Sequence, residues 1–62
     1  MELKVPSMAC SACGDTITKA IKTVDPNAVV QADPKTKLVN VTTEKPETEI
    51  REAIAAAGYP VS

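Results

Sequence analysis

Two cysteines, Cys10 and Cys13, are the residues of this sequence whose types and spacing point most directly to chemistry. A Cys-x-x-Cys spacing has three common uses: half of a four-ligand zinc site, a redox dithiol, or a two-thiolate site for a soft metal ion. The chain has no further cysteine and no histidine. Closed zinc sites usually take four such ligands, and only Asp15 lies close enough in sequence to add a carboxylate. Full zinc coordination within one chain is therefore not expected.

Two thiolates without further ligands suit Cu(I), a soft ion that thiolate ligands select. Such a site keeps one coordination position open to an incoming thiolate, so the ion can be passed on. The pattern therefore favours a metal carrier over a metal store, with Cys10 and Cys13 as the ligands. No catalytic residue is identified, and the chain is not expected to be an enzyme.

The cysteines are predicted to join a strand to a helix. Apolar and charged residues alternate over residues 2–5, which predicts a half-buried strand. From Ser11 to near Val24, apolar residues recur every three or four positions, which predicts an amphipathic helix with Ser11 as its N-cap. Cys10 then lies in the loop before the helix and Cys13 in its first turn. Free backbone N–H groups and the helix dipole are expected to favour both thiolates there.

The second half of the chain predicts a hairpin and another helix. Strands are expected over residues 28–33 and 37–42, joined by a short turn. A helix follows with Pro46 as its first residue and Gly58 as its stop. Residues 59–62 leave room for a short last strand.

The resulting order, β-α-β-β-α-β, predicts a single α+β domain over residues 1–62 with the ferredoxin-like plan. This is a sandwich of a four-stranded antiparallel sheet and two helices on one of its faces. Hydrophobic residues make up 44% of the chain, but there is one Tyr and no Phe or Trp, so the core must be aliphatic. The inner face of the hairpin is expected to carry Val30, Ala32, Val39 and Val41, while Val29 and Leu38 point outward.

Charge and composition exclude several classes of partner. Seven basic and eight acidic side chains give a net charge of -1 without a run of like charge, so nucleic acid is not an expected partner. No long apolar segment is present, so neither a signal peptide nor insertion into a membrane is expected. A reducing, cytoplasmic location with free thiols follows as the expectation.

The motif Met8-x-Cys10-x-x-Cys13 after a strand, together with Gly58-Tyr59 after the second helix, matches a known pattern. The sequence resembles the heavy-metal-associated domain family, in particular small bacterial copper metallochaperones of the cyanobacterial kind. The resemblance covers essentially the whole chain. It implies that the sulfurs of Cys10 and Cys13 bind Cu(I). It further implies that the ion is transferred to metal-binding domains of copper-transporting P-type ATPases by exchange between paired Cys-x-x-Cys sites.

Four further residues are expected to lie beside the ion: Met8, Ser11, Ala12 and Tyr59. Met8 is expected to fill the core rather than to ligate the ion. Tyr59 stands where other members of the family carry His or Lys, so that loop offers no nitrogen ligand. Two interpretations of Tyr59 remain open, a hydrogen bond to a cysteine sulfur or a cap on the core.

Two other functions compete with a soluble carrier. The chain could be a metal-binding domain excised from a P-type ATPase, although Met1 lies just before the first strand and the last strand ends the chain, which favours a free-standing protein. It could also be a thiol-disulfide oxidoreductase, but such domains are longer and usually carry an aromatic residue where Ala9 stands. The expected state is a monomer, with a dimer bridged by metal through four cysteines at high concentration.

Overall fold

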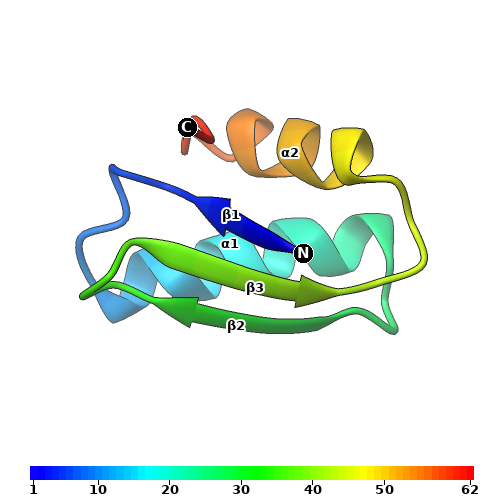
Figure 1. The fold of residues 1–62 in the computed structure, drawn as a ribbon, viewed down its shortest axis with the longest axis horizontal. Helices are drawn as coiled ribbons and strands as arrows, with labels where there is room; N and C mark the ends of the chain where they lie inside the picture. Colours follow the sequence, from blue (N-terminus) through cyan, green and yellow to red (C-terminus); the bar gives the residue numbers. More distant parts are fainter.

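The computed structural model describes all of residues 1–62. Three strands and two helices follow one another along the chain (Figure 1). They are β1 (Glu2–Lys4), α1 (Ser11–Val24), β2 (Val29–Asp33), β3 (Leu38–Thr42) and α2 (Glu47–Ala56). The two predicted helices and the first three predicted strands are therefore confirmed, with bounds that differ from the prediction by about one residue.

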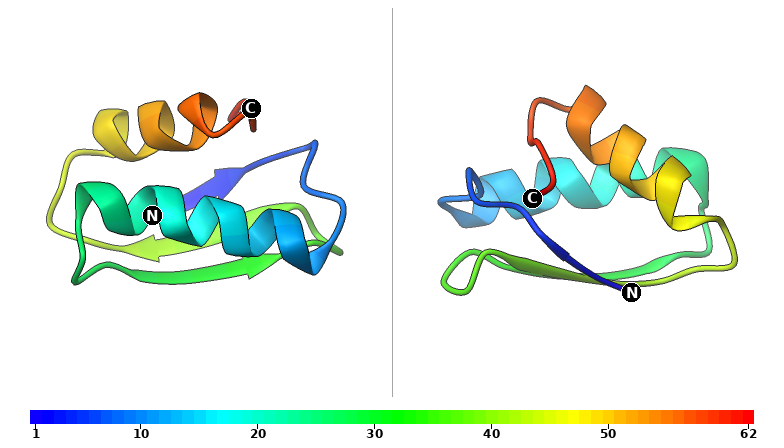
Figure 2. Two further views of the ribbon diagram at one scale, coloured as in Figure 1. Left: turned by 180° about the vertical axis from the view of Figure 1, so that it is seen from behind. Right: turned by 45° about the horizontal axis from the view of Figure 1, so that its top comes forward.

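The strands form one antiparallel sheet in the order β1-β3-β2. The central strand β3 pairs with β1, where Leu3 lies opposite Val39, and with β2, where Gln31 lies opposite Asn40. Both helices cover the same face of this sheet, as its edge-on view in Figure 2 shows. The α+β sandwich with two helices on one face is thus present. Neither helix has the length and apolar character needed to cross a bilayer.

The prediction of a fourth strand is wrong, because the sheet has three strands. Residues 59–62 pass beside β1, where the Ser62 N–H donates to the Lys4 carbonyl at 2.8 Å. Pro60 has no N–H to donate, and a single hydrogen bond does not make a ladder. The last segment therefore covers the edge of the sheet without becoming part of it.

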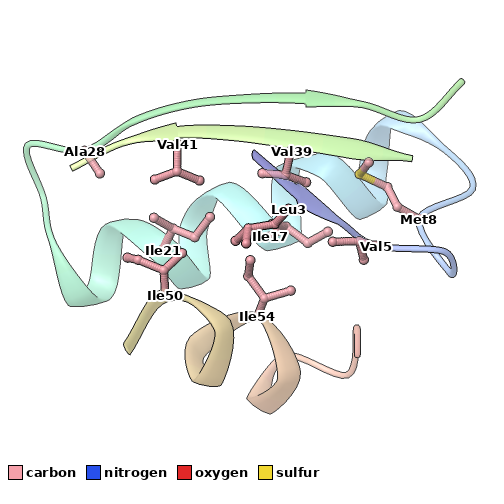
Figure 3. Close-up of a cluster of buried hydrophobic side chains, with 10 residues drawn as sticks. All are labelled: Leu3, Val5, Met8, Ile17, Ile21, Ala28, Val39, Val41, Ile50 and Ile54. Atoms are coloured by element: carbon pink, nitrogen blue, oxygen red, sulfur yellow. The ribbon is translucent and has the colours of Figure 1, made fainter. Parts of the chain in front are cut away.

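The core is aliphatic, as the composition predicts, and lies between the sheet and the helices (Figure 3). It consists of ten buried residues: Leu3, Val5, Met8, Ile17, Ile21, Ala28, Val39, Val41, Ile50 and Ile54. Val30 and Ala32 of β2 are half-buried against this cluster. Val29 points outward, as expected, and is 58% exposed. The alternation of the hairpin strands is therefore read correctly from the sequence.

The starts of both helices differ by one residue from the prediction. Cys10, not Ser11, is the N-cap of α1, since its backbone is extended at φ -151° and ψ 170° and Ser11 is already helical. Pro46 is the N-cap of α2 rather than its first residue, because its ψ of 147° is also extended. Neither cap residue makes a side-chain hydrogen bond to the helix. For α1 this shift puts the first cysteine at the helix end itself.

The loops gather at two ends of the molecule. The β1–α1 loop with the cysteines, the β2–β3 turn and the segment after α2 share one end, and the α1–β2 and β3–α2 loops share the other (Figure 1). At that second end the Thr43 hydroxyl donates to the Asp25 carboxylate at 2.6 Å. This bond is the largest cause, and the hydrogen bond from the Asn27 N–H the next largest, that holds the pKa of Asp25 below its usual value. A side-chain hydrogen bond thus joins the two loops at the end of the molecule opposite the cysteines.

Replacing Ile17 by alanine should destabilise the fold strongly. Ile17 is fully buried between α1 and the sheet, and Ile→Ala substitutions at such sites cost about 2–5 kcal/mol. A domain of this size has a free energy of unfolding on the order of 3–9 kcal/mol, so most of it should be lost. Urea denaturation followed by circular dichroism measures the change. Val29→Ala is the control: its side chain is exposed, and a loss comparable to that of Ile17→Ala would contradict this description of the core.

Candidate metal centre

The two cysteines lie together at the start of α1. Both are free thiols, and their Sγ atoms are 3.4 Å apart, close enough for one thiol to donate to the other sulfur. Cys10 is exposed, whereas Cys13 is half-buried and packs against the core cluster. One sulfur is therefore held by the body of the protein and the other is presented to solvent.

The backbone at Cys10 places both sulfurs at the positive end of the helix. The Cys10 carbonyl accepts the N–H groups of Cys13 at 3.1 Å and of Gly14 at 3.3 Å, which opens the first helical turn. The N–H groups before them have no partner within the helix and, with the helix dipole, favour negative charge. Cys13 thus lies in the first turn of the helix, as predicted, while Cys10 is the N-cap itself rather than part of the loop before it.

Two buried residues fix the segment that carries the cysteines. Met8 precedes the pair, is fully buried, and points into the core (Figure 3). Its N–H donates to the Val5 carbonyl at 3.0 Å, which closes a turn directly after β1. Ile17, one helical turn after Cys13, is fully buried as well. The thioether of Met8 belongs to the core, as the sequence favours, and the cysteines lie on a short span between two anchors.

Gly14 brings α1 unusually close to the sheet beside the site. It is buried, and a Cβ at this position would lie 3.2 Å from the Cβ of Ala32 on β2. A side chain at this position would be tight against Ala32, so Gly14 lets α1 lie close to β2 directly after Cys13. Gly14 was not among the candidate residues identified from the sequence. A glycine inside an otherwise helical pattern is the signal that could have found it.

Tyr59 packs against the core cluster and is half-buried, as one of the two interpretations from the sequence proposed. Its hydroxyl also acts on Cys13: hydrogen bonding with Tyr59 is the first cause that lowers the pKa of the Cys13 thiol to about 7, before the Ala9 N–H and the Cys10 thiol. The neighbouring Cys13 in turn raises the pKa of Tyr59. These pKa shifts favour the other interpretation as well, in which Tyr59 stabilises the Cys13 thiolate.

The other residues expected beside the ion have a smaller part in this geometry. Ser11 and Ala12 are exposed on the first turn of α1, between the two cysteines. The backbone N–H of Ala9, which was not among the expected site residues, also lowers the pKa of Cys13. No group of three or more His, Cys, Asp or Glu side chains gathers anywhere in the structure. The centre thus offers two sulfurs and an open side.

Comparison with known proteins assigns the chain to a family. The model of the heavy-metal-associated domain matches residues 2–60. A variant of the copper chaperone Atx1 from Synechocystis PCC6803, in a trimeric form, is 44% identical with a TM-score of 0.96, over 100% of this chain and 98% of that one. Oxidized MerP from Ralstonia metallidurans CH34 is 37% identical with a TM-score of 0.86, over 98% and 89% of the two chains.

Among curated proteins, the mercuric transport protein periplasmic component of Pseudomonas aeruginosa is 40% identical over 97% of this chain and 69% of its own length. The sandwich fold with a cysteine pair at the first helix defines a small metal-binding domain of the kind found in metal chaperones and metal transport, which is not a class of enzymes. The chain belongs to the heavy-metal-associated domain family.

Removing the Tyr59 hydroxyl should slow alkylation of Cys13 at neutral pH. In the wild type the pKa of Cys13 is lowered to about 7, so more of this thiol is ionised at neutral pH than of an ordinary cysteine, and the thiolate is the reactive form. Tyr59→Phe removes the largest cause of that lowering, so the pKa rises and less thiolate is present at pH 7. Iodoacetamide labelling of the metal-free protein, with mass spectrometry of the Cys13 peptide, measures the rate.

The two proteins should react at similar rates above pH 10, where Cys13 is ionised in both. This high-pH comparison serves as the control for access, because a slower reaction of Tyr59→Phe at every pH would indicate a change in exposure instead. Equal rates of the two proteins at pH 7 would show that the hydroxyl does not stabilise the thiolate.

Proposed function

We propose that the domain carries Cu(I) between the sulfurs of Cys10 and Cys13 and passes it on by ligand exchange. The single observation that carries this proposal is the pair of free sulfurs 3.4 Å apart, with one exposed and no third Cys, His, Asp or Glu gathered beside them. A soft ion that needs few ligands suits such a pair, and Cu(I) is one of the ions that thiolates select. The reduced thiols that this requires fit a cytoplasmic location.

The different settings of the two cysteines support a carrier. With metal–sulfur bonds of about 2.3 Å, as in zinc thiolates, two sulfurs on opposite sides of one ion lie roughly 4.6 Å apart. The present separation of 3.4 Å is shorter, so the sulfurs must move apart when the ion enters. Cys10 is exposed and precedes the helix, whereas Cys13 is packed against the core. The movement therefore falls mainly to Cys10.

The same asymmetry gives a route for transfer. A thiolate of an acceptor can approach the ion from the open side, bind it as a third ligand and then displace Cys10. The ion remains attached to Cys13 until the acceptor's second thiolate arrives. The acceptors we propose are metal-binding domains of copper-transporting P-type ATPases, in keeping with the high similarity to a copper chaperone. The protein acts as a monomer, and metal bridges two copies through four cysteines only at high concentration.

Titration of the reduced protein with Cu(I) against a competing Cu(I) chelator tests the ligands. One Cu(I) per chain is expected. The double variant Cys10→Ser, Cys13→Ser should bind it more weakly by over about a hundredfold, a greater loss than for a residue that only supports a ligand. Met8→Leu is the control, since its thioether is buried and the exchange conserves volume. An undiminished Cu(I) affinity of the double variant would contradict the proposal that the two cysteines are the ligands.

Mercury is the second candidate cargo. It is favoured by a separate observation, the similarity to four mercuric transport proteins, which are 38–40% identical to this chain. Two thiolates also suit Hg(II), which is soft. A transfer experiment separates the two functions: the loaded protein is mixed with an isolated ATPase metal-binding domain, and the metal on each protein is measured after separation. Rapid passage of Cu(I) supports the copper carrier. Retention of Cu(I), with release of Hg(II) to a cysteine-pair acceptor, supports the mercury carrier.

A further inference from the structure

The turn that leads to the cysteines is held by the β2–β3 hairpin, which lies beside it at the same end of the molecule (Figure 1). At the start of the turn, the Val5 N–H donates to the Lys37 carbonyl at 2.8 Å. At the end of the turn, the Lys37 ammonium group donates to the Met8 carbonyl at 2.7 Å, across a separation of 29 residues. Lys37 therefore makes hydrogen bonds to both ends of the turn, one through its carbonyl and one through its ammonium group.

Lys37 has an unusual backbone for a lysine. Its φ of 65° lies in the left-handed region, and no other non-glycine residue of the chain has a positive φ. Glycine adopts this region without strain, whereas a side chain with a Cβ does so at a cost. The Lys37 N–H closes the hairpin turn by donating to the Asp33 carbonyl at 2.9 Å, which glycine could do as well. What lysine adds at this position is its half-buried ammonium contact with Met8.

Cys10 depends on this contact more than Cys13 does. Cys13 is held by the helix and by packing on the core, but the Cys10 side chain is exposed. Its backbone is fixed on one side by the helix start, where its carbonyl accepts the N–H groups of Cys13 and Gly14, and on the other side by Met8, two residues earlier. The Met8 side chain is held by burial and its carbonyl by a charged donor, which makes a strong type of hydrogen bond.

The geometry points to Lys37 as a positioning residue of the metal centre, which sets Cys10 relative to Cys13 by fixing the Met8 carbonyl. The residue touches no metal ligand directly. It acts through the backbone of residues 8–10, much as residues that orient a ligand act in other metal sites. This inference rests on the proposed function only for its metal-binding readout, since the position of Cys10 is also a property of the metal-free protein.

Lys35 provides a matched control in the same turn. Its N–H donates to the Asp33 carboxylate at 2.9 Å, but its side chain is exposed and makes no hydrogen bond or ion pair in the structure. Lys37→Met and Lys35→Met each remove one positive charge from the hairpin. Only the first removes the contact with Met8. Lys37→Gly removes the contact too, but it also relieves the left-handed strain.

The experiment measures Cu(I) affinity by chelator competition and stability by urea denaturation for the full chain and these three variants. Lys37→Met and Lys37→Gly should bind Cu(I) about tenfold more weakly, the lower end of the losses seen when a ligand's supporting residue is removed. Lys35→Met should match the wild type. Lys37→Gly should be at least as stable as Lys37→Met, because glycine relieves the left-handed strain, but it should bind Cu(I) no more tightly. If Lys37 affected Cu(I) binding only through the stability of the fold, the affinity would follow the stability. Equal affinities of Lys37→Met and Lys35→Met would overturn the inference.

A metal-free measurement separates this inference from the proposed function. Amide hydrogen exchange at Met8, whose N–H closes the turn, should be faster in Lys37→Met than in Lys35→Met, with exchange in β3 unchanged. Unchanged exchange at Met8 would overturn the role of Lys37 whatever metal the protein carries. A wild type that fails to bind Cu(I) but shows the expected exchange would refute the copper proposal and leave the positioning role supported.

Discussion

Burial of aliphatic side chains on both sides of the cysteine pair is the constraint on which the rest of the structure depends. Met8 before the pair and Ile17 after it are both fully buried in a core that holds no aromatic residue among its ten members. The span between these anchors is short, so the loop must turn back sharply and the helix must begin at once. Both sulfurs are then held at the helix start although only Cys13 contributes to the packing. The core thus supports the metal centre without enclosing it.

Most of the fold could be predicted because it is encoded in short-range patterns. Spacings of three and four residues gave α1 from Ser11 to Val24, and alternation gave the hairpin and its inner face. The fourth strand was wrongly predicted, since four residues that include Pro60 make one hydrogen bond to β1 and no ladder. The N-cap of α1 was misplaced by one residue because a preferred residue type, Ser11, follows the position that the backbone selects.

The centre was predictable as far as its chemistry is local in the sequence. The Cys-x-x-Cys spacing gave the pair and its place at the helix start, and burial of Met8 followed from its position after a strand. The Gly58-Tyr59 motif also allowed Tyr59 to be named beside the cysteines, although not which of its two interpretations holds, because that depends on packing across the fold. The contact of Lys37 with the Met8 carbonyl was not foreseen, since it joins residues 29 positions apart and no pattern in the intervening sequence marks it.

The placement of Tyr59 gives the domain a built-in optical reporter. The chain has no tryptophan and one tyrosine, so its entire near-ultraviolet emission arises from Tyr59, the residue that does most to lower the pKa of Cys13. An ion that enters beside the Cys13 sulfur changes the surroundings of the only fluorophore, while the aliphatic core is silent at these wavelengths. Loading and release of the metal ion can therefore be followed in real time through the tyrosine emission of the unlabelled protein.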